Sequence, residues 1–222
     1  MHNKDDPRIY RFPETKNWKK LQISEEGLYS ITPPAFSKFI SEKIAEKMKK
    51  KFGMDKKEIT ITDASSCVGG DAIRFCFEFK HVNCVEFNPE HMRMLQNNLK
   101  VFGLKNASFY EGSYETFCDK LENDVIFCDP PWGGTDYLQN DSLRLKYGES
   151  HVEDLANKAK TKLIVMKLPL NYDLFYLHDK MPCTEVIIVK RKNGQPFFLL
   201  TFKEANIIIS NSLKKEVKSQ NK

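Results

Sequence analysis

The run from Asp124 to Gly134, Asp-Val-Ile-Phe-Cys-Asp-Pro-Pro-Trp-Gly-Gly, constrains the fold of this chain more than any other segment. Its apolar part, Val125 to Cys128, is short and begins with β-branched residues, which is typical of a buried strand. Two prolines follow Asp129, and because proline has no backbone N–H the strand must end there. The sequence therefore predicts that Asp129 and the flat ring of Trp132 lie on a stiff turn at the end of a buried strand.

Strand and helix patterns alternate along most of the chain. The expected strands are Glu58 to Ala64, Val82 to Phe87, Ala107 to Tyr110, Asp124 to Asp129, Lys162 to Lys167, Thr184 to Lys190 and Pro196 to Lys203. The expected helices are Pro33 to Phe52, Asp71 to Phe79, Pro89 to Val101, Tyr114 to Leu121, Val152 to Ala159 and Tyr172 to His178. This alternation predicts an α/β fold with a mainly parallel sheet covered on both faces. Asn193-Gly194 indicates a turn that pairs the last two expected strands as an antiparallel hairpin at the end of the sheet.

The 222 residues fit one domain with a modest extension. We expect an N-terminal extension at 1–53 (an arm plus a helix) that closes the site, a core at 54–209 and a mobile basic tail at 210–222. The six cysteines are scattered and the histidines show no ligand spacing, which predicts reduced thiols, an intracellular location (nucleus, cytoplasm or viral) and no metal site. No apolar stretch is long enough to cross a bilayer, so no membrane association is expected.

The first twenty residues interleave Tyr10, Phe12 and Trp18 with basic side chains. Two interpretations remain open: an arm that binds nucleic acid, or a chain terminus whose aromatic rings pack on the domain. The formal charge of +5 permits a phosphate-bearing partner without requiring one.

A nucleotide-type site is expected after the first strand. Asp63 ends that strand, Gly69-Gly70 precede a helix, and Glu86 ends the next strand 17 residues after Gly69, where a carboxylate can accept from ribose hydroxyls. The chain lacks the G-x-G-x-x-G pattern of a pyrophosphate site, and Asp63 would repel phosphate but attract an ammonium. These features favour S-adenosylmethionine over NAD. The simpler alternative is a helix cap at the glycines and a surface glutamate.

The Asp-Pro-Pro-Trp element resembles the (Asn/Asp/Ser)-Pro-Pro-aromatic motif of amino-methyltransferases that act on nucleic-acid bases. An exocyclic amine is a poor nucleophile because its lone pair is delocalised into the ring. Acceptors on Asp129 and Pro130 can hold its two hydrogens while an aromatic ring fixes the base by stacking. The alternative is a strand end followed by an ordinary Pro-Gly turn.

Taken together, the motifs resemble those of the trimethylguanosine synthase family, which methylates the 2-amino group of the RNA cap guanosine. The likeness runs from about Leu21 to Asp173 and includes the segments Glu25 to Pro33, Asp63 to Gly70, Asn97-Asn98 and Pro130 to Gly134. The resemblance implies a Rossmann-like class I S-adenosylmethionine-dependent methyltransferase with a helical N-terminal extension. It implies a capped RNA carrying 7-methylguanosine as the partner, and we expect a monomer.

The resemblance also implies roles for individual residues. Cofactor binding falls to Thr32, Asp63, Gly69, Glu86, Ser113 and Asp129; catalysis to Asp129, Pro130 and Trp132; and substrate binding to Pro131, Trp132, Lys167, Asn171 and Lys16. Trp132 would stack on the positively charged 7-methylguanine.

Three positions depart from the family pattern. Ser113 stands where many relatives have an aspartate, Asp129 where they usually have a serine, and Leu170 where an arginine usually binds phosphate. Lys167, Lys16 or Arg11 would then have to hold the cap phosphates. Because adenine-directed enzymes use an aspartate at the position of Asp129, methylation of an adenine amine in DNA or RNA is a second hypothesis. A non-catalytic RNA-binding scaffold is a third.

Overall fold

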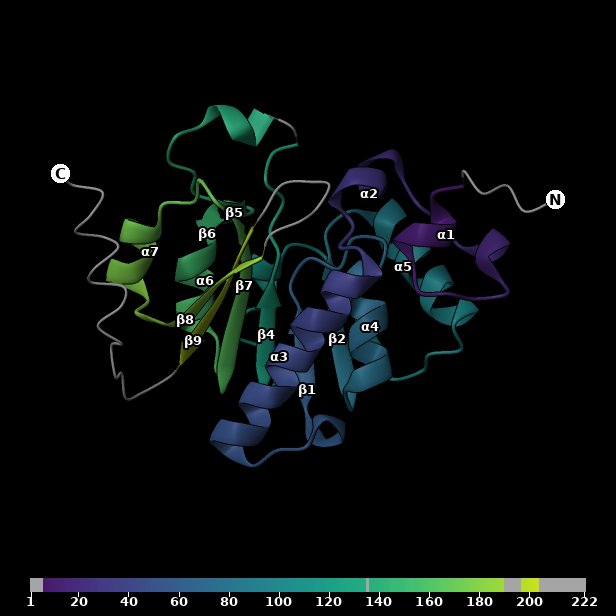
Figure 1. The fold of residues 1–222 in the computed structure, drawn as a ribbon, viewed down its shortest axis with the longest axis horizontal. Helices are drawn as coiled ribbons and strands as arrows, with labels where there is room; N and C mark the ends of the chain where they lie inside the picture. The colour runs from purple at the N-terminus through teal and green to yellow at the C-terminus, as the bar shows by residue number, and fades with distance from the viewer. Residues whose placement is uncertain (1–5, 135, 190–196, 204–222) are drawn as a thin grey trace.

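A seven-stranded sheet forms the centre of the protein (Figure 1). The computed structural model describes residues 6–134, 136–189 and 197–203. The strands lie in the spatial order β3 (Ala107–Glu111), β2 (His81–Glu86), β1 (Thr60–Asp63), β4 (Val125–Cys128), β7 (Leu163–Pro169), β9 (Phe197–Lys203) and β8 (Cys183–Val189). The first five are mutually parallel, and β9 is antiparallel to both of its neighbours. The predicted α/β fold with a C-terminal antiparallel pair is confirmed; the predicted turn at Asn193-Gly194 lies outside the described residues.

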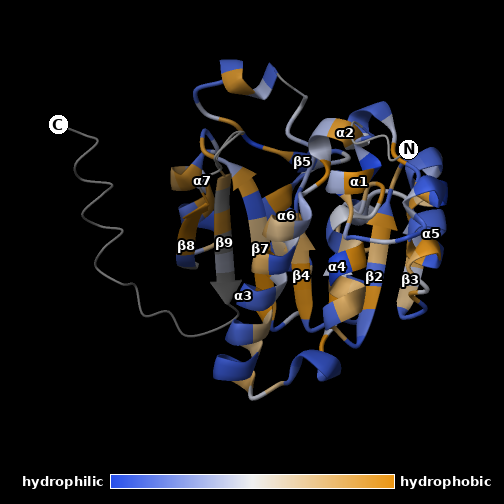
Figure 2. Ribbon diagram, turned by 45° about the vertical axis from the view of Figure 1, so that its right-hand side comes forward, coloured by the Kyte–Doolittle hydropathy of each residue, from blue (hydrophilic) through white to orange (hydrophobic). Residues whose placement is uncertain are grey.

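Alternate residues of the strands face two separate hydrophobic clusters. In β4, Val125 and Phe127 join one cluster, and Ile126 and Cys128 join the other. The first face is covered by α3 (Pro34–Phe52), α4 (Gly70–Glu78) and α5 (Pro89–Val101), and the second by α6 (Val152–Lys158) and α7 (Leu174–Lys180). Strands β4 and β7 are correspondingly apolar along most of their length (Figure 2). A parallel sheet buried on both faces requires such continuous apolar strands.

Helix α3 follows the expected pattern closely. Pro34 occupies its first turn, where the missing N–H costs nothing. Ile40, Ile44 and Met48 form a buried stripe against the sheet. The helix ends at Phe52, and the following Gly53, with a φ of 71°, closes the last turn.

The N-terminal residues fold onto the domain in short segments. These are α1 (Arg8–Arg11), η1 (Trp18–Lys20) and α2 (Glu25–Ser30). Phe12 is 2% exposed, and the Arg8 guanidinium lies 5.4 Å from the Trp18 ring centroid and donates to backbone carbonyls at Lys19 and Leu21. Of the two interpretations, packing on the domain therefore describes Phe12 and Trp18, while Tyr10 remains exposed.

Asn98 of α5 fixes this extension to the core. Its side chain is fully buried, accepts from Gln22 N (2.8 Å) and donates to Gln22 O (2.7 Å) and Val68 O (2.8 Å). The neighbouring Asn97 donates to Lys20 O at 2.8 Å. Buried backbone groups need such partners, so this asparagine pair joins the extension to the loop that precedes α4.

Some elements differ from the expectation. The helix predicted from Tyr114 to Leu121 is wrong: only Tyr114–Thr116 forms a 3-10 turn (η3), since the chain there continues in turns after the buried Tyr114. Helix α2 and the two-stranded hairpin β5 (Lys146–Tyr147) and β6 (Ser150–His151) were not expected. Within the described ranges, no helix combines the length and apolar character needed to cross a bilayer.

Candidate active site

The candidate site lies where the chain reverses its direction across the sheet. From β1 the order proceeds outward through β2 and β3, and it then continues on the other side of β1 with β4. Ligands of open α/β sheets bind outside the carboxyl ends of the strands at such a point. A cavity of about 780 Å³ opens there, which is within the size range of small-molecule sites. Its walls come from the segments after β1, β2, β3 and β4, from α2 and from the β5–β6 hairpin.

The loop between β1 and α4 is tightly packed. Gly69 has a φ of 103°, and a Cβ there would lie 2.9 Å from Leu95 Cδ1. A Cβ on Gly70 would lie 2.5 Å from Ile31 Cγ1. Real Cβ contacts are not this short, so the two glycines let α5 and the extension approach the loop.

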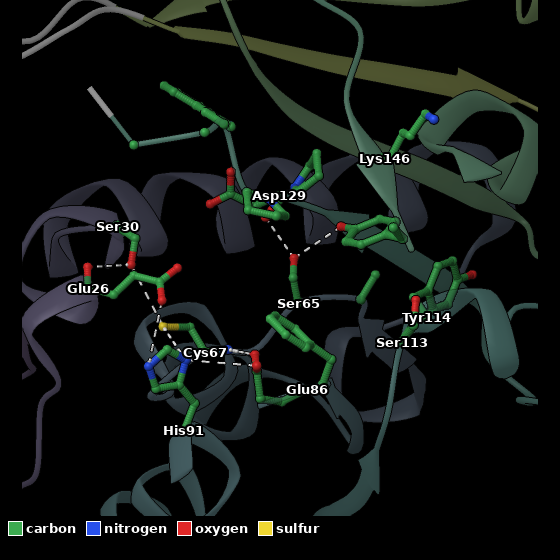
Figure 3. A pocket seen from close by; sticks show the side chains of 18 of the residues that line it. Glu26, Ser30, Ser65, Cys67, Glu86, His91, Ser113, Tyr114, Asp129 and Lys146 are labelled. Carbon is green, nitrogen blue, oxygen red and sulfur yellow. Dashed lines mark hydrogen bonds and ion pairs between the residues drawn. The ribbon is translucent and has the colours of Figure 1, made fainter. Parts of the chain in front are cut away.

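Glu86 is a fixed carboxylate on the cavity wall (Figure 3). It is 4% exposed, and its two oxygens accept from Cys67 N (2.8 Å) and Asn88 N (2.9 Å). Cys67 has a φ of 47°, which is unusual for a residue with a side chain and marks local strain at this loop. Burial raises the pKa of Glu86, and the two backbone bonds oppose that shift.

His91 connects Glu86 to the extension. Its Nδ1 lies 3.8 Å from Glu86 Oε1, and its Nε2 lies 3.9 Å from Glu26 Oε2 on α2 (Figure 3). Two carboxylates therefore flank this ring from opposite sides. The loop between β1 and α4, helix α5 and helix α2 meet at this imidazole.

The turn after β4 forms the opposite part of the cavity. Pro130, Pro131 and Trp132 line it together with the side chain of Asp129. The Trp132 ring contacts the Tyr137 ring edge-on, with centroids 5.2 Å apart and an interplanar angle of 75°. Its buried indole N–H has no hydrogen-bond partner among the described residues.

Ser65 joins the two halves of the cavity. Its hydroxyl donates to the backbone oxygen of Asp129 at 2.7 Å and lies 3.0 Å from the Tyr147 hydroxyl (Figure 3). Since Ser65 follows β1 and Asp129 follows β4, this bond fixes the two strand ends relative to each other.

Two further carboxylates lie behind the cavity wall. Asp63 is 1% exposed, and its Oδ2 has no partner in the described part of the chain. Burial, followed by the nearby Asp71, raises the pKa of Asp63 well above its ordinary value. Burial also raises the pKa of Asp71 to about 6, although Lys167 acts in the opposite direction.

Replacing Asp71 should change how stability depends on pH. The Asp71 pKa is higher in the folded state than its ordinary value of 3.8, so this group stabilises the fold at low pH and loses that contribution as the pH rises through about 6. Asp71→Asn should therefore reduce the fall in the free energy of unfolding between about pH 4 and pH 6, by up to about 1.4 kcal/mol per pH unit. Urea unfolding at a series of pH values measures it. The exposed Asp119→Asn is the matched control for loss of one carboxylate, and an unchanged slope in Asp71→Asn would contradict the expectation.

The structure brings most of the predicted site residues to one cavity. Those that line it are Glu86, Ser113, Asp129, Pro130, Pro131, Trp132 and Lys167. Ser113 also accepts from Glu115 N at 3.3 Å, as the cap of η3. Thr32, Asp63 and Gly69 are not part of the cavity lining; Thr32 is buried and bonded to Lys167.

Two predicted substrate residues lie elsewhere. Lys16 is exposed and outside the cavity lining. The Asn171 side chain donates to the backbone oxygens of Tyr137 and Asn140, both at 2.7 Å, and so holds the loop that carries Tyr137. Leu170 is exposed and does not line the cavity either.

Sequence reasoning missed several wall residues. Glu26, Tyr29 and Ser30 come from the unexpected helix α2, and Lys146 to Gly148 from the unexpected hairpin. Phe87 directly follows Glu86 and is 67% exposed. A large apolar residue next to a strand-end carboxylate was a usable signal for a ligand surface.

Comparisons with known proteins agree with this geometry. Residues 58–211 match the family model described as RNA cap guanine-N2 methyltransferase. The chain is 29% identical over 167 residues to the trimethylguanosine synthase of Saccharomyces cerevisiae, a match that covers 69% of this chain and 50% of that protein. It is 36% identical over 132 residues to an uncharacterised protein of Acanthamoeba polyphaga mimivirus, covering 56% and 52%. The matches thus span about half the length of these curated relatives.

A solved structure shows the same fold. The precorrin-6y C5,15-methyltransferase of Geobacter metallireducens superposes with a TM-score of 0.58 at 16% identity, covering 84% of this chain and 95% of that one. Family and class I fold imply S-adenosylmethionine as the cofactor. The donor set fits a nucleoside of this kind, since Glu86 offers a carboxylate and Phe87 an exposed ring on the same wall. By its sequence, its sheet and its cavity, this chain belongs to the RNA cap guanine-N2 methyltransferase family of S-adenosylmethionine-dependent methyltransferases.

Proposed function

We propose that this methyltransferase acts on the exocyclic 2-amino group of the 7-methylguanosine cap of RNA. The observation that carries the proposal is the position of the Trp132 ring on the cavity wall beside Asp129, at the end of β4. The family description and the yeast trimethylguanosine synthase support the same substrate. The cavity volume of about 780 Å³ is compatible with two ligands side by side.

In this proposal the residues after β4 orient the substrate. Asp129 and the backbone oxygen of Pro130 accept the two amine hydrogens, which directs the nitrogen lone pair out of the base plane. When bound, S-adenosylmethionine supplies an electrophilic methyl group on a sulfonium. Asp129 accepts the amine proton late or passes it to solvent, and no protein nucleophile is required. Positioning and fixed charges then account for most of the rate.

Trp132 selects the base. A 7-methylguanine carries a positive charge, and a cation over an indole ring gains on the order of 1–2 kcal/mol. Plain guanine gains less, which gives a physical basis for preferring a cap that is already methylated. The Lys167 ammonium lies near this ring and is paired with Asp129. A base at the ring would therefore lie close to one fixed positive and one fixed negative charge.

At the other end, Glu86 accepts from the ribose hydroxyls of the cofactor, and Ser113 contacts the adenine. Asp63, Gly69 and Thr32 act from behind the wall, because they shape the loop rather than line the cavity. Helix α2, which contributes Glu26, Tyr29 and Ser30 to the wall, closes the site from the extension. Capped RNA as the partner, a monomeric state and a nuclear, cytoplasmic or virus-associated location stay predictions.

The proposal is tested by mass analysis of a 7-methylguanosine cap dinucleotide after incubation with the protein and S-adenosylmethionine. We expect one or two added methyl groups on the 2-amino group and none on a cap that lacks the 7-methyl group. An adenine-containing oligonucleotide in parallel tests the second hypothesis, which Asp129 favours. Methylation of that oligonucleotide but not of the cap would contradict the proposal, and failure to bind S-adenosylmethionine would favour a non-catalytic scaffold.

A further inference from the structure

Lys167 is a buried lysine within the candidate active site. It lies on β7, is 4% exposed and still contributes to the cavity wall. Its Nζ donates to Asp129 Oδ2 at 2.5 Å and to Thr32 Oγ1 at 3.1 Å. The same nitrogen lies 5.3 Å from the centroid of the Trp132 ring.

Burying an ammonium is costly unless it is paired and hydrogen-bonded. Here the cost is offset by Asp129, by the Thr32 hydroxyl and by the nearby Asp71. Asp129 lines the cavity, whereas Thr32 and Asp71 are buried behind its wall, so the ammonium is held between the cavity and the protein interior. An ammonium has three N–H donors, and Lys167 already gives two of them to Asp129 and Thr32, which leaves little of its donor capacity for a phosphate.

The partners of Lys167 are the groups that would hold the substrate. A carboxylate offers about four acceptor positions, so a bond to the ammonium is compatible with a further bond to an amine. The ion pair fixes the direction of the Asp129 carboxylate, and the cation at the ring helps fix Trp132. Thr32 extends the network to the segment between α2 and α3.

We propose that Lys167 is a positioning residue for amine methylation, acting through Asp129 and Trp132, and that it does not bind the cap phosphates. This inference rests on the proposed function. It revises the expectation from the sequence, in which Lys167 compensates for the missing arginine at Leu170.

The experiment compares Lys167→Met with wild type on two substrates. One is the 7-methylguanosine cap dinucleotide, and the other is 7-methylguanosine nucleoside, which has no phosphate. We expect kcat to fall by about a hundredfold on both, with KM and the Kd of S-adenosylmethionine changing less than about threefold, because misplacing a catalytic group affects the chemical step. A defect confined to the dinucleotide, seen as a raised KM, would overturn the proposal in favour of phosphate binding.

Lys162→Met is the matched control. Lys162 precedes the same strand β7 and is paired with Asp124, which precedes β4, so the two strands carry one Lys–Asp pair at each end. Lys162 is exposed and outside the cavity lining. Its replacement should leave kcat within about twofold of wild type.

A double variant tests whether Lys167 acts through Asp129. If it does, Asp129→Asn with Lys167→Met should be about as slow as the slower single variant on the dinucleotide, because residues that act as a unit are not additive. Losses that multiply would overturn the proposal. If Lys167→Met fails to fold by circular dichroism, Lys167→Arg keeps the charge and changes the geometry. A positioning role predicts a lower kcat on both substrates, and unchanged kinetics would overturn it.

The two levels of inference fail differently. Wild-type protein that binds S-adenosylmethionine but methylates neither substrate contradicts the proposed function, and the positioning role with it. Wild-type protein that methylates the cap while Lys167→Met does so equally well contradicts the positioning role alone.

Discussion

Trp132→Ala is expected to lower kcat/KM for the 7-methylguanosine cap by at least about a hundredfold, while the affinity for S-adenosylmethionine stays within about threefold. The ring lies on the cavity wall, between the edge contact with Tyr137 and the ammonium of Lys167. Losing it removes on the order of 1–2 kcal/mol of stacking with a charged base. It also removes the surface that fixes the angle at which the amine is presented, which accounts for the larger part of the effect.

The chain offers its own control for this substitution. The other tryptophan, Trp18, packs in the extension beside Arg8. Trp18→Ala should lower the thermal midpoint and leave the kinetics on folded protein close to wild type. Calorimetric titration with S-adenosylmethionine completes the comparison. Equal losses of cofactor affinity and cap turnover in Trp132→Ala would contradict a stacking role, because they would indicate a general collapse of the cavity.

Glu86→Gln is expected to weaken S-adenosylmethionine binding by about tenfold or more. The carboxylate accepts backbone bonds from Cys67 and Asn88 at the cavity wall. An amide has a single acceptor oxygen, so one backbone N–H and one bond to the ribose must be lost or weakened. Charge-assisted bonds of this type are worth about 1.5–3 kcal/mol each. Glu86→Ala should have a larger effect, since it leaves both backbone donors without the carboxylate.

Glu111 provides the control for Glu86. It ends β3 directly opposite Glu86 in the parallel register and is exposed. Glu111→Gln should leave the affinity for S-adenosylmethionine unchanged when both variants are titrated under the same conditions. Unchanged affinity in Glu86→Gln as well would rule out the ribose assignment.

Much of the fold could be predicted from sequence because its central strands β1, β4 and β7 are almost fully buried. Val125 to Cys128 and the first strand are continuous apolar or β-branched runs, and such runs carry a strong signal. The turn at Asp129 and Trp132 could be placed because prolines end a strand for a covalent reason. The parallel order then put the ends of β1, β2 and β4 at one edge of the sheet.

Features that depend on distant parts of the chain could not be predicted. The partner of Lys167 is set by the pairing of β4 with β7, which brings together residues 38 positions apart. Helix α2 has only six residues. The residue that caps it, Ile31, packs against Gly70, which lies far along the chain. The segment after Tyr114 has helical composition but ends after one 3-10 turn. Short elements gain little from intrinsic propensity, so tertiary contacts decide them.

The Asn98 amide has a practical consequence for anyone who shortens or grafts this protein. This one side chain is hydrogen-bonded to the backbone of Gln22 and of Val68 at the same time. A version cut downstream of Gln22 would remove two of the four hydrogen bonds of this side chain and leave a buried amide only partly paired, at about 1–3 kcal/mol for each unpaired group. A shortened version should therefore begin upstream of Leu21, so that the catalytic unit keeps the segment to which Asn98 is bound.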